Sequence, residues 1–331
     1  MSKYKSLAVQ LGKILFAGGL IYYLIHSGDL NFTAVFSVFT KPFLGLSIFG
    51  FFLLGQILLG ATRWMYLLKG VGYSITLIKA CRLQVMGFFF NTAMPGAVGG
   101  DLIKVLYVIR DNPSRGKTPA MLSIFLDRVI GLSGLFCIGL VSSCFELDFV
   151  FSDPILSAIF LTKIVLILGI FLFFFAALYR YKKEDPFSKI LSKEIFGFPQ
   201  ILKIYESLRA YRDQPKTIVR CFGISVVIQL MSLLLFYLIT KETLAIPDVS
   251  FGKIALIFPI GIFSMALPLA PGGLGVGHVA FDKLFDMIGL TSGATIANIY
   301  IVSLLFLNLF GVISYLMERK EIPKEGELSA T

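Results

Sequence analysis

The sequence is poor in charge and in cysteine. Asp, Glu, Lys and Arg make up 15% of its 331 residues, and it has four cysteines and two histidines. The cysteines form no CxxC pair and share no metal-like spacing with a histidine, so neither a metal site nor a disulfide framework is predicted. The net charge of +10 is spread mostly over the connections between apolar runs, which leaves no compact basic domain to bind nucleic acid.

Motifs for cofactors and catalysis are also lacking. The stretch GAVGGD at residues 96–101 is rich in glycine, but no strand precedes it and no βαβ pattern surrounds it, as a dinucleotide site or P-loop would require. No Ser-His-Asp set, HExxH or paired-carboxylate signature stands out. We therefore expect no cofactor, no metal and no enzymatic activity.

Apolar residues are present in great excess. They make up 56% of the chain, the mean hydropathy is +0.84 and there are 33 phenylalanines, a composition outside the range of soluble globular domains. Runs of roughly 20 apolar residues recur, the length that a helix needs to cross about 30 Å of hydrocarbon. The sequence predicts an all-α polytopic integral membrane protein with about six full spans, at residues 6–26, 43–68, 119–141, 155–179, 217–240 and 293–316.

We expect a single transmembrane domain over residues 1–316. Its halves are about 1–179 and 217–316, and the sizeable polar stretch between them, 180–216, is rich in Lys and Arg. Residues 317–331 are expected to form a flexible tail. Because Lys and Arg accumulate in cytoplasmic loops, we predict that the 180–216 loop and both termini are cytoplasmic, in a bacterial inner membrane.

Two further apolar regions, residues 73–109 and 251–289, are interrupted by glycine and proline. Counting spans from the cytoplasmic loop, the first region begins and ends inside, and the second begins and ends outside. Non-helical backbone at membrane depth is tolerated where protein or a water-filled cavity satisfies its amides. Paired interruptions in two halves also point to an inverted repeat with a site between them. We favour two oppositely oriented re-entrant helical hairpins; the alternative is a tight pair of full spans in each region.

Candidate site residues begin with charges that lie within apolar sequence. Asp101 follows Gly99 and Gly100 and opens an apolar run, so it is placed either to cap a helix or to mark an anion site at exposed amides. Asp127 and Arg128 lie about nine residues into a span, where an ionisable side chain usually faces a cavity or a partner. These positions predict a polar site inside the membrane domain.

The partners of these charges can also be proposed. Adjacent residues on a helix point about 100° apart, so Asp127 and Arg128 are expected to have separate partners. Asp127 can pair with Arg63 or Lys104, and Arg128 can face Asp101 or a lipid phosphate; a purely structural buried ion pair is the alternative. Arg63 lies near the cytoplasmic end of its span, where its long side chain is expected to reach the interface.

The turns of the interrupted regions supply the remaining candidates. The glycines of the second turn permit close approach by a ligand or by a neighbouring helix. His278 follows the second turn and is placed either for proton coupling, with Asp282 as its partner, or for an ordinary hydrogen bond. The other candidates in the turns are Pro95, Gly96, Pro271, Gly272, Gly273 and Gly275.

A resemblance to a known family rests on three segments in order along the chain: PGAVGGDLIKV, DRVIGL and PGGLGVGHVAF. Together with TRWMYLL at the end of a span, they resemble the flippase-like transmembrane family typified by the membrane portion of lysylphosphatidylglycerol synthases. The resemblance implies movement of phospholipid-like molecules between leaflets, with two hairpins lining a central cavity. Family members commonly have an acidic residue shortly after the second PGG, where this chain has His278. The bifunctional synthases continue into a large aminoacyl-transfer domain, whereas about fifteen polar residues follow the last span here, so we do not expect lysyl transfer.

We therefore expect a lipid flippase or transporter whose basic cavity holds an anionic headgroup, phospholipid-like or polyprenyl-linked. Its partners would be that lipid and the bilayer. Two alternatives stay open. A membrane-embedded transferase acting on a lipid phosphate would use Asp101 and Asp127 as base or metal ligands, and a non-transporting subunit would bind a separate synthase or glycosyltransferase through residues 180–216.

Overall fold

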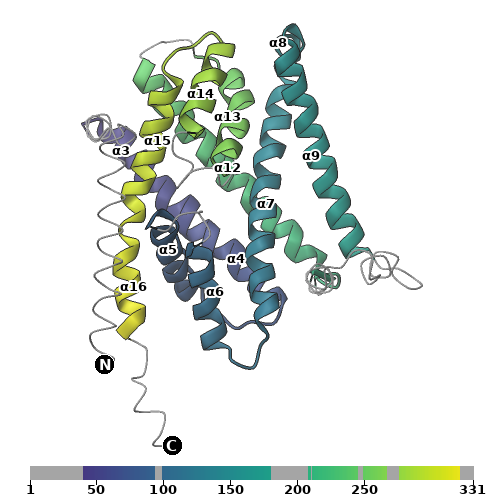
Figure 1. Ribbon diagram of the computed structural model, residues 1–331, viewed down its shortest axis with the longest axis vertical. Helices are drawn as coiled ribbons and strands as arrows, with labels where there is room; N and C mark the ends of the chain where they lie inside the picture. The colour runs from purple at the N-terminus through teal and green to yellow at the C-terminus, as the bar shows by residue number, and fades with distance from the viewer. Residues whose placement is uncertain are drawn as a thin grey trace, which may run out of the picture.

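The chain folds into a bundle of helices. The computed structural model describes residues 40–93, 99–179, 208–209, 211–244, 249–266 and 276–320. Within these ranges the regular elements are helices and no strand occurs, which confirms the predicted all-α class (Figure 1). The first predicted span and most of the 180–216 loop lie outside the described residues.

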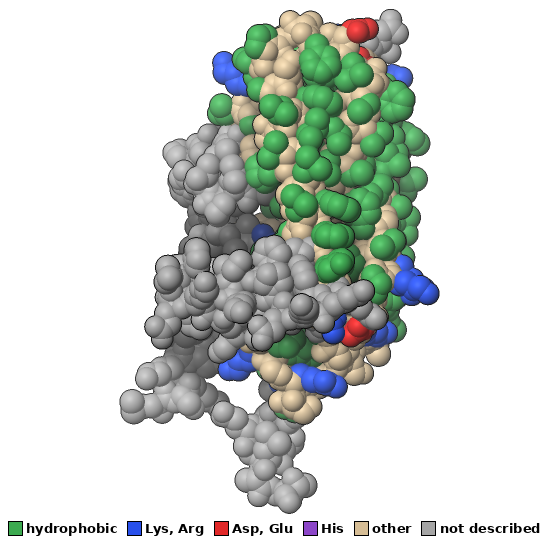
Figure 2. All heavy atoms as spheres, turned by 90° about the vertical axis from the view of Figure 1, so that its right-hand side faces the viewer, with side chains coloured by type: hydrophobic (Ala, Val, Ile, Leu, Met, Phe, Trp, Pro, Cys, Tyr) green, Lys and Arg blue, Asp and Glu red, His purple; other side chains and the backbone are tan. Residues whose placement is uncertain are grey.

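The long apolar helices lie where hydropathy predicts them. Five are long and apolar enough to cross a membrane, and they match the five predicted spans that fall within the described ranges: Pro42–Gly70, Lys117–Cys144, Pro154–Phe175, Pro215–Leu244 and Gly293–Glu318. The face around α9 (Pro154–Leu178) is covered with hydrophobic side chains, and Lys and Arg gather at its lower end (Figure 2). A wide apolar surface of this kind is what contact with lipid requires.

The first of these spans consists of three helical segments. A π-helical stretch, η1 (Phe51–Leu59), lies between α3 (Pro42–Gly50) and α4 (Gly60–Gly70). π-helical geometry is rare in proteins, and where it occurs it is often at a functional site. The remaining spans are formed by α7 (Lys117–Cys144), α9, α12 (Pro215–Leu244), and α15 (Gly293–Asn308) followed by α16 (Gly311–Lys320).

Each interrupted region forms two short helices. The first region contains α5 (Leu77–Ala93) and α6 (Gly99–Asp111), and the second contains α13 (Phe251–Ala266) and α14 (Val276–Met287). The two helices of each pair pack against each other. Figure 1 shows α5 and α6 in the lower half of the bundle and α13 and α14 in the upper half, so the pairs occupy opposite ends.

Aromatic packing holds the upper half together. The ring of Phe236 on α12 has its centroid 5.1 Å from that of Phe258, 4.8 Å from that of Phe281 and 5.6 Å from that of Tyr300. These rings come from α13, α14 and α15. Each such pair contributes about 0.5–1.5 kcal/mol beyond the area that it buries, so the cluster fixes the second helix pair against the spans.

A buried lysine ties α9 to the same region. Lys163 is fully buried, and its Nζ donates to the carbonyl oxygen of Leu256 at 2.7 Å and to the hydroxyl of Ser143 at 3.1 Å. Leu256 lies three residues before Pro259, within α13. Sequence reasoning did not single out Lys163.

The C-terminal helix extends beyond the predicted end of the last span. The flexible tail was predicted to begin at residue 317, but α16 continues to Lys320. Glu318 on this helix is fully buried and lies 2.5 Å from Nζ of Lys79. Lys79 also lies 3.1 Å from Asp111, so this cluster joins α16 to the base of the α5–α6 pair.

Candidate functional site

A cavity of about 300 Å³ opens between the spans and both helix pairs. Its lining comes from η1, α4, α5, α6, α7, α12 and α15, and α13 adds Ile262. The volume is at the lower end of the range for small-molecule sites. Five charged side chains line it: Arg63, Asp101, Lys104, Asp127 and Arg128.

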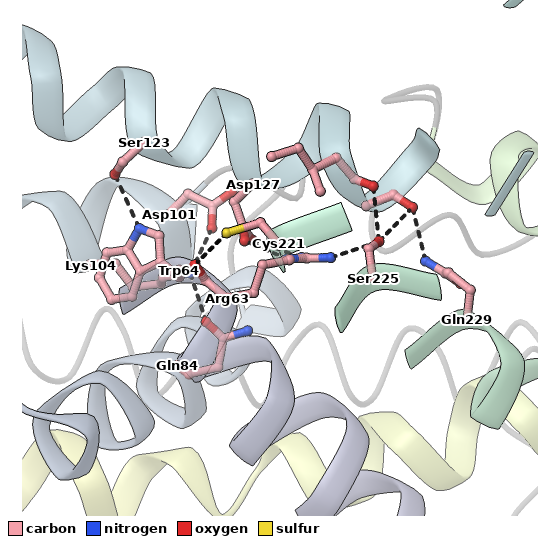
Figure 3. Close-up of polar contacts among 12 residues, drawn as sticks. Arg63, Trp64, Gln84, Asp101, Lys104, Ser123, Asp127, Cys221, Ser225 and Gln229 are labelled. Carbon is pink, nitrogen blue, oxygen red and sulfur yellow. Dashed lines mark hydrogen bonds and ion pairs between the residues drawn. The ribbon is translucent and has the colours of Figure 1, made fainter. Parts of the chain in front are cut away.

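The deepest charged pair joins α4 to α7. Nε of Arg63 donates to Oδ1 of Asp127 at 2.7 Å, and a second guanidinium nitrogen donates to Oδ2 at 3.0 Å, so the pair is bidentate (Figure 3). A third nitrogen of Arg63 donates to the hydroxyl of Ser225 on α12 at 3.1 Å. Arg63 is only 9% exposed. The expectation that Arg63 reaches the interface was therefore wrong, because Asp127 and Ser225 hold its guanidinium inside the bundle.

A second charged pair joins α6 to α7. Arg128 donates to Oδ2 of Asp101 through Nε at 2.7 Å, and its Nη2 lies 2.6 Å from the same oxygen. The side chain of Asp101 is 12% exposed, whereas that of Arg128 is 46% exposed. Both expected pairings, Asp127 with Arg63 and Arg128 with Asp101, are therefore present. Asp101 is not the N-cap, because α6 begins at Gly99 and the carboxylate points to Arg128 instead.

Lys104 is the third cation of the cavity. It is 4% exposed, and its Nζ donates to Oε1 of Gln84 at 2.8 Å. The same ammonium lies 4.3 Å from the centroid of the Trp64 ring, a cation–π contact, and 3.7 Å from Oδ1 of Asp101. Figure 3 shows the lysine between these groups. Its hydrogen-bond partner is therefore neutral, and the carboxylate near it, Asp101, is also held by Arg128.

The five charges leave an excess of one positive charge. In their ordinary charged forms the lining side chains carry three positive charges, on Arg63, Lys104 and Arg128, against two negative ones, on Asp101 and Asp127. Coulombic attraction is stronger away from bulk water. A group with one negative charge would balance this excess.

The backbone of α6 approaches that of α5 at two glycines. A Cβ at Gly100 would lie 1.8 Å from the carbonyl oxygen of Gly87, so no larger residue fits there. The N–H of Gly100 donates to Oδ1 of Asn91 at 2.8 Å, which satisfies an amide in the first turn of α6. The contacts at Gly100 are therefore those of close helix packing.

Similarity to known proteins shows which family the chain belongs to. The family described as "Lysylphosphatidylglycerol synthase TM region" matches residues 10–312. The chain belongs to this family. UPF0104 membrane protein PH1989 of Pyrococcus horikoshii is 21% identical over 287 residues, which cover 80% of this chain and 84% of that protein. No solved structure matches the chain.

Membership in the lysylphosphatidylglycerol synthase TM region family confirms the resemblance expected from the sequence. With five apolar spans, it indicates a multi-pass membrane protein with a lipid-related function. The segments behind that resemblance meet only in part at the cavity. PGAVGGDLIKV supplies Asp101 and Lys104, and DRVIGL supplies Asp127 and Arg128.

The remaining predicted residues that the structure describes do not line the cavity. His278 is on α14 and does not line the cavity, and Asp282 accepts from the backbone N–H of Ala294 at 3.4 Å. Gly99 is the first residue of α6. The other candidates lie outside the described residues: Pro95, Gly96, Pro271, Gly272, Gly273 and Gly275.

Sequence reasoning missed the uncharged polar lining. Ser225, Gln229 and Ser232 lie on one face of α12, with Ser225 bonded to Arg63 and the other two lining the cavity. Tyr300 of α15, Gln56 of η1, and Gln84 and Asn91 of α5 also line the cavity. The available signal was the spacing of the α12 residues at i, i+4 and i+7, which places polar side chains on one face of an otherwise apolar span.

Proposed function

We propose that this protein is a flippase or transporter that moves an anionic lipid, phospholipid-like or polyprenyl-linked, between the leaflets of the inner membrane. The headgroup would occupy the cavity while the hydrocarbon chains stay in the bilayer. The observation that carries the proposal is the buried cavity with one excess positive charge, from Arg63, Lys104 and Arg128 against Asp101 and Asp127. Ionisable groups inside a membrane domain are costly and commonly mark a substrate pathway.

The short helices support a transporter architecture. The lengths of α5, α6, α13 and α14 are 17, 13, 16 and 12 residues. At 1.5 Å per residue they reach roughly 18–26 Å, less than the hydrocarbon thickness of about 30 Å. We propose that they form two re-entrant hairpins that enter from opposite sides, as their places at opposite ends of the bundle suggest. Six full spans would then include residues 6–26.

The distribution of charge supports the proposed orientation. Lys and Arg gather at the lower end of the face in Figure 2, which the positive-inside rule assigns to the cytoplasm. Helix α16 also ends low in Figure 1. The C-terminus would therefore be cytoplasmic, with the α5–α6 hairpin entering from the cytoplasmic side, and a sixth span at residues 6–26 would place the N-terminus there as well.

The engagement of both carboxylates favours transport over catalysis. A transferase would need Asp101 or Asp127 as a base or as a metal ligand. Each accepts two hydrogen bonds or close contacts from an arginine, so each carboxylate already has a cationic partner. We therefore propose that no bond of the lipid is made or broken.

Arg128→Gln is expected to slow lipid movement about tenfold or more. Arg128 is the more exposed of the two paired arginines, so it can turn from Asp101 to a phosphate oxygen. A hydrogen bond to a charged group contributes about 1.5–3 kcal/mol, which corresponds to a factor of at least ten. The measurement is dithionite quenching of tail-labelled phosphatidylglycerol in vesicles that contain the purified protein.

Arg110→Gln is the matched control. Arg110 lies at the end of α6 and pairs with Asp111 outside the cavity, so its loss should leave the rate unchanged. Wild-type vesicles that quench no faster than protein-free vesicles would contradict the proposal. A mass shift of the labelled lipid after incubation would favour the transferase instead.

A further inference from the structure

The cavity has an uncharged end as well as a charged end. Ser225, which is bonded to Arg63, begins a polar face on α12 that continues through Gln229 to Ser232. At 1.5 Å per residue, Ser232 lies about 10 Å along the helix axis from Ser225. Tyr300 and Gln56 line the same part of the cavity. A ligand whose charged group occupies one end can therefore reach amide and hydroxyl groups at the other.

The polar groups at this end suit a hydroxylated ligand. The hydroxyls of Ser232 and Tyr300 lie 2.6 Å apart, and each residue is only 5% exposed. Their mutual hydrogen bond uses one of two hydroxyl protons, so the pair keeps a donor and several lone pairs. Gln229 uses its amide nitrogen on the carbonyl oxygen of Gly131 at 3.2 Å, and the amide oxygen is a further acceptor. Together these groups can both donate to and accept from a hydroxyl.

The same cavity is poorly suited to an ammonium group. Both carboxylates that line it, Asp101 and Asp127, are already held by arginines. The excess positive charge would also repel a cation. A headgroup with an amine would therefore lose its hydration without gaining a carboxylate partner.

We infer that the lipid substrate is a phosphodiester whose headgroup is a neutral polyol, such as glycerol, inositol or a sugar. This inference rests on the proposed function. The single phosphodiester charge neutralises the excess carried by Lys104, next to Arg128. The hydroxyls of the polyol bind at the Ser232–Tyr300 pair, which selects among anionic lipids.

The test compares two phosphodiester lipids, of which only one has hydroxyls on its headgroup. The full-length protein is equilibrated in mixed micelles with equal amounts of phosphatidylglycerol and phosphatidylethanol with identical acyl chains, together with phosphatidylethanolamine and phosphatidylcholine. Retained lipid is measured by mass spectrometry. We expect phosphatidylglycerol to exceed phosphatidylethanol roughly tenfold, since each neutral hydrogen bond contributes a factor of roughly two to ten.

Tyr300→Phe and Ser232→Ala should remove most of that preference. Each removes one hydroxyl, and retention of phosphatidylethanol at the wild-type level shows that the variant is folded. Tyr237→Phe is the matched control, because the Tyr237 hydroxyl donates to the carbonyl oxygen of Val249 at 3.1 Å, away from the cavity. This control should keep the full preference.

The outcomes separate this inference from the proposed function. Equal retention of phosphatidylglycerol and phosphatidylethanol, both above the amine lipids, would overturn the polyol assignment and leave the flippase proposal standing. Preference for phosphatidylcholine would also overturn the polyol assignment. It would indicate instead that the ammonium is held by the aromatic rings of the lining, Phe51, Phe88 and Tyr300. Retention without any lipid preference would overturn both proposals.

Discussion

Gly100→Ala is expected to prevent accumulation of stably folded protein. The new methyl group would lie 1.8 Å from the carbonyl oxygen of Gly87 and 2.6 Å from its carbonyl carbon. Both are backbone atoms within α5, so no side-chain rotation relieves the clash and the two helices must separate. Overpacking commonly costs about 1–3 kcal/mol, and we expect this case at or above the upper limit. Fluorescence-detected size exclusion and thermal unfolding in detergent would measure the loss.

Gly223→Ala on α12 is the control for the same chemical change. No atom lies within 4 Å of a Cβ at Gly223, and α12 is helical there. Alanine favours a helix over glycine by about 1 kcal/mol, so this variant should be as stable as the wild type or more so. Equal stability of the Gly100→Ala and Gly223→Ala variants would mean that α5 and α6 do not cross at Gly87 and Gly100.

The contact between α5 and α6 at Gly87 and Gly100 also holds cavity residues in place. Asn91 and Gln84 extend from α5 into the cavity, and Asp101 and Lys104 extend from α6. If α6 moves outward, Lys104 leaves Gln84, to which it donates at 2.8 Å. A Gly100→Ala variant that is rescued by low temperature should therefore also lose preference for anionic lipid.

The outline of this fold is predictable from the sequence because it depends on hydrocarbon thickness. Hydropathy located every long span within the described residues, and glycine and proline marked the two interrupted regions. The partners of Asp127 and Arg128 were also correctly restricted, since adjacent helix positions cannot share a partner. Each of these predictions needs only local sequence and the properties of the bilayer.

The features that could not be predicted from the sequence depend on which helices pack together. Arg63 was expected at the interface because its distance from the end of the span allows this, and only the packing of α4 against α7 and α12 buries it. The role of Gly100 depends on Gly87, thirteen positions earlier on another helix. The polar lining depends on how α12 is rotated, and apolar composition says little about rotation. Lys163 likewise required knowledge that α9 lies against the proline-containing α13.

Removing either member of the Arg63–Asp127 pair is expected to destabilise the protein more than removing both. Asp127→Leu leaves a guanidinium that is 9% exposed without its carboxylate. Arg63→Met leaves the Asp127 carboxylate without its guanidinium. Loss of one partner of a buried pair costs about 3–5 kcal/mol, whereas replacement of both by apolar residues is often neutral or stabilising. Thermal and denaturant unfolding of the two single variants and the double variant would give the coupling between the sites.

An exposed ion pair supplies the control for this double-mutant cycle. Lys41 lies 2.8 Å from Glu242, with side chains 48% and 45% exposed. Exposed pairs contribute about 0–1 kcal/mol, so Lys41→Met and Glu242→Leu should be nearly additive. Additivity at Arg63 and Asp127 as well would mean that their bidentate contact does not stabilise the folded state.

The double variant also separates the stability of the site from its selectivity. Arg63 and Asp127 together are neutral, so replacing both leaves the excess charge of Lys104 unchanged. A folded Arg63→Met/Asp127→Leu protein should therefore still retain anionic over zwitterionic lipid. Arg63→Met alone would remove that excess and, if folded, should lose the preference. Loss of preference in the double variant would mean that Arg63 contacts the headgroup directly, which requires it to exchange Asp127 for a phosphate during transport.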